Sequence, residues 1–236
     1  MGDRMHRLTW YHHSLGLIAC ILLCTSMATT PAMADLITFN FTGYVSKVGD
    51  KLSDGTIHKH QYVTGSYTFN SDTLDNNLSN RIGEYKGALN GPITNFNVTI
   101  GTYDGFLGTG ANEIEVKNLR GLSHDSYEVE GALYRYGDQV NGYKPKSFEL
   151  ELEHLKHSST YRFNGDDLPS VPPDLSAFKE KTLRLEFGYG GHDKSVLIHL
   201  KTLTAVPLPP AVILFGAGLA ALIGLGARWK KVEVKV

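Results

Sequence analysis

The sequence predicts an all-β fold, an antiparallel β-sandwich of Greek-key or jelly-roll type, within a chain of 236 residues. Three observations predict it. Apolar and polar side chains alternate in short stretches between residues 36 and 203, and a period of two is typical of half-buried strands. Turn-forming residues separate these stretches. Residues 35–205, about 170 in number, are enough for one sizeable core.

About nine segments are expected to be strands. In the first, apolar side chains from Ile37 to Val45 share one face, and polar side chains from Thr38 to Tyr44 share the other. The clearest pattern is that of Phe148, Leu150 and Leu152, which alternate with three glutamates. The expected strands are 36–45, 61–69, 84–89, 96–103, 112–117, 127–136, 147–153, 182–187 and 195–203.

The connections between these segments contain turn signals such as Asn141-Gly142. One connection is different, because residues 167–174 contain three prolines and cannot form a central strand. We expect it to cross the fold as a long loop, followed by at most one helical turn, with Leu175 and Phe178 against the core. Since a closed sheet shows the same alternation as a sandwich, a jelly roll or a closed barrel is the alternative.

The first 34 residues have the pattern of a secretory signal peptide. Arg4 and Arg7 precede an apolar run, and Ala32 and Ala34 form a small-x-small cleavage site before Asp35. We expect signal peptidase to cut after Ala34. The alternative is a lipoprotein signal that ends at Cys20, but the apolar run continues beyond that residue.

The last 31 residues, 206–236, predict a membrane segment. Residues 211–227 carry no charge and span roughly 26 Å as a helix, at the short end of what a bilayer needs. Arg228, Lys230 and Lys231 follow, which places this end in the cytoplasm. The chain is therefore expected to be anchored in the inner membrane, with residues 35–205 facing the periplasm. Gly216, Ala220 and Gly224 form a small-residue stripe that permits close packing of helices.

Charge and cysteine content exclude several classes of site. Residues 35–205 carry 17 basic and 22 acidic side chains, a net charge of −5 with histidine neutral, so nucleic acid is not an expected partner. Cys20 and Cys24 are the only cysteines, and both lie in the predicted signal peptide. The mature domain would then have neither a disulfide nor a cysteine nucleophile.

No motif in the sequence indicates catalysis, so neither an enzyme nor a cofactor is expected. His58 with His60 and His154 with His157 suggest metal ligands, but a solvated surface explains them better. Oxygen-bearing side chains that favour calcium also occur in one turn, although without the spacing of a defined calcium loop. These weak calcium candidates are Asp72, Asp75, Asn76 and Asn77.

Two sets of residues are compatible with carbohydrate chemistry. Glu128 and Glu130 could act as paired carboxylates, although a solvent-facing strand explains them better. Six tyrosines could form a sugar-stacking face, although tyrosine is also common in any strand. They are Tyr127, Tyr134, Tyr136, Tyr143, Tyr161 and Tyr189.

The C-terminal order of motif, apolar helix and basic cluster resembles the PEP-CTERM protein-sorting signal, in its Val-Pro-Leu-Pro-Ala variant. The resemblance covers Val206 to Lys231 and implies that Val206, Pro207, Leu208 and Pro209 are recognised by exosortase. Exosortase is a membrane transpeptidase or protease of Gram-negative bacteria that make exopolysaccharide. Pro210 stands where the variant has alanine, and Val232–Val236 extend a tail that is usually short.

The resemblance implies a non-catalytic surface or matrix protein that is released to the outer surface or the medium and associates with exopolysaccharide. The alternative is a carbohydrate-binding module that uses the tyrosines or a calcium loop. A glycan-active enzyme is the third hypothesis.

Overall fold

A computed structural model describes residues 36–53, 55–87, 91–119, 124–154, 163 and 165–206. Within these residues the chain forms nine strands and three short 3₁₀ helices. The helices are η1 (Asp50–Leu52), η2 (Leu175–Ala177) and η3 (His192–Lys194). The strands are β1 (Leu36–Val48), β2 (Tyr62–Asn70), β3 (Ile82–Gly87), β4 (Ile93–Ile100), β5 (Tyr103–Lys117), β6 (Ser126–Leu133), β7 (Pro145–Glu153), β8 (Glu180–Phe187) and β9 (Ser195–Ala205).

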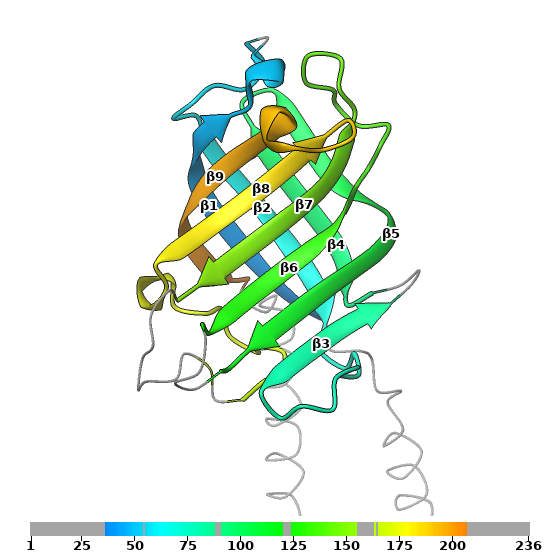
Figure 1. Cartoon of the computed structure of the whole chain (residues 1–236), viewed down its shortest axis with the longest axis vertical. Helices are drawn as coiled ribbons and strands as arrows, with labels where there is room; N and C mark the ends of the chain where they lie inside the picture. Colours follow the sequence, from blue (N-terminus) through cyan, green and yellow to red (C-terminus); the bar gives the residue numbers. More distant parts are fainter. Residues whose placement is uncertain are drawn as a thin grey trace, which may run out of the picture. The chain divides into compact units, whose positions relative to one another are not determined.

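Eight of the strands form one closed antiparallel barrel (Figure 1). The order is β1, β2, β4, β5, β6, β7, β8 and β9, and β9 pairs with β1 from Ala205 and Phe39 to Val196 and Val48. The ninth strand, β3, pairs with β5. The prediction of an all-β antiparallel fold is confirmed. The prediction of a sandwich is wrong, because the first and last strands join and leave a single sheet closed on itself.

Strand β5 makes this arrangement possible because it has different neighbours along its length. Tyr103–Phe106 pair with β4, and Asn112–Lys117 pair with β3. Between these halves, the pairing of β5 with β6 is interrupted by a bulge from Leu107 to Asn112. The buried Asn112 side chain accepts a hydrogen bond from the Ile93 N–H (2.8 Å) and donates one to the Ile93 carbonyl (3.1 Å). This amide therefore replaces strand pairing at the start of β4.

Aromatic side chains fill the barrel. Phe96 of β4 and Phe148 of β7 come from well-separated strands, and their rings stack with centroids 3.7 Å apart and planes at 9°. The Tyr67 hydroxyl donates to the Tyr127 hydroxyl at 3.2 Å in the same interior. Gly65, opposite Phe41 in the ladder, leaves room for the Phe41 ring, since a Cβ there would lie 2.3 Å from it. The core is a packed aromatic interior.

Each of the nine predicted segments overlaps an observed strand, but the first half of β5, from Tyr103 to Ala111, was not predicted as part of that strand. Two boundaries also differ in where they place tyrosines. Tyr103 begins β5 instead of ending β4, because Gly101, with φ of +60°, forms a tight turn with Thr102. Strand β6 ends at Leu133, so Tyr134 and Tyr136 lie in the loop that follows it. In both cases, tyrosines lie in a different element from the one that the alternating pattern predicts.

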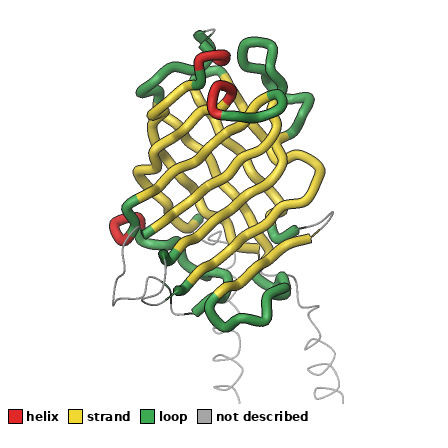
Figure 2. The backbone as a smooth tube through the Cα atoms, viewed as in Figure 1, coloured by secondary structure: helices red, strands yellow, loops and turns green. Residues whose placement is uncertain are grey.

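The barrel has two dissimilar ends. The terminal end carries Leu36 and Val206, whose N–H donates to the Thr38 carbonyl at 3.0 Å. Helix η2 lies at this end, whereas η1 and η3 lie at the opposite, distal end (Figure 2). As expected, one helical turn follows the proline segment, Phe178 is buried and Leu175 packs against the core.

No helix among the described residues is long and apolar enough to cross a membrane. The predicted membrane segment 211–227 lies outside the described residues.

Candidate functional site

An open cleft of about 700 Å³ lies at the distal end of the barrel. Its lining comes from the end of β6, the β6–β7 loop, the start of β7, the turn after β8 and the β5 bulge. Four of the six tyrosines singled out in the sequence lie here: Tyr134, Tyr136, Tyr143 and Tyr189. We call this feature the tyrosine cleft. Of the other two, Tyr127 is buried in the core, and Tyr161 lies outside the described residues.

Tyr189 is presented by a glycine-rich turn between β8 and η3. Its side chain is 96% exposed, which is unusual for a large aromatic residue. Gly188 and Gly190 on either side have φ of +61° and +82°, a region that glycine adopts without strain. The Gly188 N–H donates to the Lys144 carbonyl at 2.8 Å, which ties this turn to the β6–β7 loop.

The β6–β7 loop is held in place by its own short hairpin. Val140 and Tyr143 exchange backbone hydrogen bonds of 3.1 and 2.9 Å across Asn141 and Gly142, both of which have positive φ. The predicted Asn-Gly turn is therefore confirmed. Val140 is fully buried, and the Asn141 amide donates to the Lys51 carbonyl at 2.9 Å. These contacts give the tyrosine cleft a fixed shape.

Three of the four tyrosines of the cleft are exposed: Tyr134, Tyr136 and Tyr189. Tyr134 and Tyr136 are 46% and 78% exposed, and their rings meet edge to face with centroids 5.9 Å apart. Aromatic faces of this kind stack against the C–H face of a pyranose ring, and the hydroxyls can bond to its substituents.

Basic residues of this site were not singled out in the sequence. Arg135, Lys144 and Lys146 line the tyrosine cleft. Lys194 lies over the Tyr143 and Tyr189 rings, at 5.4 and 6.0 Å from their centroids. The signal that could have found them is the interleaving of tyrosine with arginine and lysine from Tyr134 to Lys146.

A second feature is a field of glutamates on the outer face of β5, β6 and β7. Glu115 lies opposite Glu128, which lies opposite Glu151 on the next strand. The next row holds Glu113, Glu130 and Glu149 in the same way. Glu113, Glu115, Glu128 and Glu130 line a hollow of about 200 Å³. These side chains share one face of neighbouring strands and do not face one another across a cleft, as the glycosidase hypothesis requires.

The crowding of these glutamates changes their acidity. Desolvation, followed by the charges of Glu149, Glu130, Glu115 and Glu151, raises the pKa of Glu128 to about 7 from an ordinary 4.5. Desolvation is also the main cause that raises the pKa of Glu113 and of Glu151. Like charges directly opposite each other on a sheet are destabilising. The ionised glutamate field therefore works against folding.

We expect the stability of the barrel to fall between pH 4.5 and 7. The raised pKa of Glu128 means that its stabilising effect is complete below the unfolded value of 4.5 and is lost as the pH rises through about 7. Because Glu128 is only half-buried, the full shift is discounted to about 1–2 kcal/mol. Glu128→Gln should therefore raise the free energy of unfolding at pH 8 by that amount and leave it nearly unchanged at pH 4.5, as measured by chemical denaturation.

Substitution of Glu186 is a control for which the expected change in stability has the opposite sign. Its pKa is lowered, chiefly by the hydrogen bond from Lys146, so Glu186→Gln should destabilise the protein at pH 8. Equal effects of Glu128→Gln at both pH values would contradict this account of the glutamate field.

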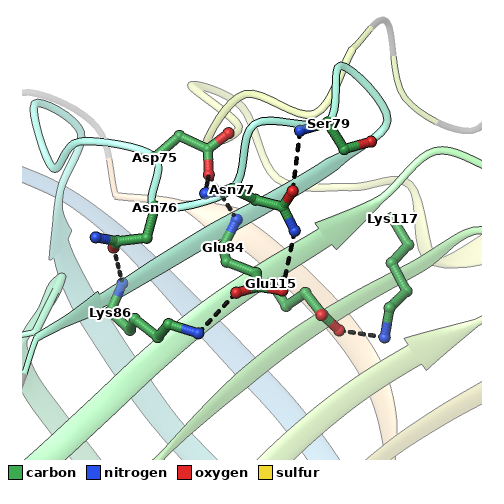
Figure 3. A network of polar contacts seen from close by, with 8 residues as sticks. All are labelled: Asp75, Asn76, Asn77, Ser79, Glu84, Lys86, Glu115 and Lys117. Carbon is green, nitrogen blue, oxygen red and sulfur yellow. Dashed lines mark hydrogen bonds and ion pairs between the residues drawn. The ribbon is translucent and has the colours of Figure 1, made fainter.

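Three of the four calcium candidates, Asp75, Asn76 and Asn77, lie in a segment along the free edge of β3 (Figure 3). One Asp75 carboxylate oxygen accepts hydrogen bonds from the N–H groups of Asn77 (2.8 Å) and Glu84 (2.9 Å). The Asn76 side-chain oxygen accepts from the Lys86 N–H at 3.2 Å, and the Asn77 oxygen from the Ser79 N–H at 2.9 Å. Most of the proposed calcium ligands therefore serve backbone N–H groups, and this segment covers an edge that would otherwise be open to pairing.

Other predicted positions contribute less. His58 and His60 are exposed in the loop before β2, and the described part of the chain brings no three His, Cys, Asp or Glu side chains together as a metal site. Val206 is 42% exposed directly after β9. The remaining positions of the signal-cleavage site, sorting motif and basic cluster lie outside the described residues: Ala32, Ala34, Asp35, Pro207, Leu208, Pro209, Arg228, Lys230 and Lys231.

Comparison of the chain with protein-family models, with curated proteins and with solved structures gave no match in any of the three.

Proposed function

We propose that this chain is a non-catalytic surface or matrix protein of the cell exterior. Residues 1–34 direct its export, residues 211–227 hold it in the membrane, and exosortase recognises Val206, Pro207, Leu208 and Pro209. Exopolysaccharide is its proposed partner outside the cell. The sequence feature that carries this proposal is the order of motif, apolar segment and basic cluster at the C-terminal end.

The position of Val206 supports processing at this motif. Strand β9 ends at Ala205, and Val206 is partly exposed at the terminal end of the barrel. Proteases cut more readily at exposed chain outside a sheet than within one. The barrel can therefore stay folded while its tail is processed.

The mass of the mature protein tests this proposal. The full chain is expressed with and without exosortase in a Gram-negative host, and both ends are determined by mass spectrometry. We expect an N-terminus at Asp35 in both strains and loss of the residues after the motif only with exosortase. An intact Val236 in both strains would refute processing.

The tyrosine cleft favours a second function, the binding of carbohydrate. Tyr134, Tyr136, Tyr143 and Tyr189 gather in one concave site, although three of them come from one loop and the fourth from another. The site lies at the distal end, away from Val206. A protein held through its C-terminus would thus present this cleft away from its point of attachment. Exposed aromatic faces in a preformed concave site are typical of ligand binding.

We expect the double substitution Tyr136→Ala and Tyr189→Ala to weaken binding of a polysaccharide by about 5- to 150-fold, since each aromatic stack contributes about 0.5–1.5 kcal/mol. The matched control is Tyr44→Ala with Tyr62→Ala, an exposed pair on β1 and β2 with ring centroids 5.4 Å apart. Retention of the full-length protein on immobilised polysaccharides is the measurement. Equal retention of both double variants would exclude the tyrosine cleft as the binding site.

A further inference from the structure

Positive charge collects at the tyrosine cleft, and most of it lies outside ion pairs between described residues. Lys146 is neutralised by Glu186 at 2.8 Å. Among the described residues, none of the ion pairs includes Arg135, Lys144 or Lys194. The Lys144 ammonium lies 5.6 Å from the centroid of the Tyr136 ring, and Lys194 lies over Tyr143 and Tyr189. Lys144 and Lys194 therefore border the rings without an ion pair to any described residue, and Arg135 lines the same cleft.

This charge contrasts with the rest of the same wall. The cleft adjoins a hollow of about 360 Å³ through Ala132 and Lys146, which line both. That hollow contains Glu130, Glu149 and Glu186, and the glutamate field continues beyond it. Along the outer surface of β6 and β7, the charged groups thus change from carboxylates in the glutamate field to unpaired cations at the tyrosine cleft. Along the glutamate field the cations are paired, Lys117 with Glu115 and Arg184 with Glu149, whereas those at the tyrosines are outside the ion pairs of the described residues.

We propose that the tyrosine cleft selects an anionic sugar, one that carries a carboxylate or sulfate on its ring. This inference rests on the proposed binding of carbohydrate. The C–H face of the sugar lies on Tyr136 and Tyr189, and the acidic substituent at the ring edge reaches Lys144 and Lys194. A charged partner strengthens a hydrogen bond roughly twofold over a neutral one. The lysines therefore determine the preference for an anionic sugar, and the tyrosine rings contribute the affinity that charged and neutral sugars share.

Nucleic acid offers the same combination of flat faces and anions, but the surface does not suit it. A single strand carries a phosphate at every nucleotide and needs a basic groove that follows the backbone. Here the cations form one local group, and the adjoining hollow is lined by glutamates. A polymer with charge at every unit is repelled on one side of the cleft. A polysaccharide whose acidic sugars alternate with neutral ones is not.

The test compares polymers that differ only in charge. Binding of the full-length protein is measured for hyaluronan and its methyl ester, and for κ-carrageenan and its desulfated form, because in both charged polymers an acidic sugar alternates with a neutral one. We expect the charged member of at least one pair to bind about tenfold more tightly at low salt, with the preference lost as salt screens the charges. The pair that shows the preference identifies carboxylate or sulfate as the group recognised. Tighter binding of a single-stranded oligonucleotide than of either charged polymer would overturn the proposal.

Substitutions then separate charge from stacking. Lys144→Met with Lys194→Met keeps the alkyl stems and should reduce the preference to about twofold or less, while binding of the neutral polymer is kept. Lys201→Met, an exposed lysine on β9, is the matched control and should change neither. Equal binding of charged and neutral polymers by the unmodified protein would overturn the choice of an anion but leave carbohydrate binding intact. Absence of binding to all four polymers would overturn both the proposed carbohydrate binding and the proposed preference for an anionic sugar.

Discussion

Replacing Phe148 by alanine is expected to destabilise the barrel by about 3–5 kcal/mol, the largest effect of any single substitution considered. Phe148 is 1% exposed, and its ring stacks on Phe96 at 3.7 Å between centroids. The two rings bring β4 and β7 into contact through the barrel interior. Truncating Phe148 therefore removes buried apolar area from both strands. The surrounding strands are closed into a barrel and cannot collapse into the gap. Chemical denaturation of the full-length protein measures the loss.

Two further variants are the controls for Phe148→Ala. Phe148→Leu keeps most of the volume and should cost about 1–1.5 kcal/mol. Phe106→Ala removes a ring that is 49% exposed and should cost about 0.5 kcal/mol or less. If Phe148→Ala were no more harmful than Phe106→Ala, the Phe96–Phe148 stack would not hold the barrel together.

The second large effect is expected for Asn112→Ala, with a loss of about 2–4 kcal/mol. The Asn112 side chain bonds to both the N–H and the carbonyl of Ile93, at 2.8 and 3.1 Å, and both residues are buried. Without the amide, one buried donor and one buried acceptor lose their partners, at about 1–3 kcal/mol each. Amide hydrogen exchange at Ile93 should accelerate together with the loss of stability.

Asn97→Ala is the control for this prediction. Its amide donates to the Ser66 hydroxyl at 2.6 Å on a partly buried outer face, where water can replace the bond. Its cost should be about 0.5–1 kcal/mol. Similar losses for the Asn97 and Asn112 variants would show that water reaches the start of β4.

The strands were predictable because each buries one face against a single core. Phe148, Leu150 and Leu152 alternate with glutamates, and they lie inside the barrel as that pattern predicts. Closure was not predictable, since it depends on the pairing of β1 with β9, strands at opposite ends of the domain. Alternation records which face is buried but not which strand lies alongside. The first half of β5 was missed because Gly105, Gly108 and Gly110 interrupt the apolar pattern there.

The tyrosine cleft was predictable in part. Residue type alone selected the tyrosines, since aromatic rings outside the core suggest binding. Only the fold separates Tyr127, which is buried beside Tyr67, from Tyr189 on its glycine turn. The position of Lys194 over Tyr143 also depends on the fold, because the two residues belong to different loops. Side chains that meet across loops leave no spacing in the sequence.

Strand β9 connects the two ends of the barrel and has a mechanical consequence. It runs from η3, beside the tyrosine cleft, to Val206, and it is bonded to β1 along its length and to β8 over its first part. Tension between a ligand in the cleft and the chain beyond Val206 acts along this strand, perpendicular to its hydrogen bonds. The hydrogen bonds of β9 are then loaded in shear and must break together, instead of one after another. A barrel tethered in this way resists pulling most strongly along the direction in which attachment and ligand would pull.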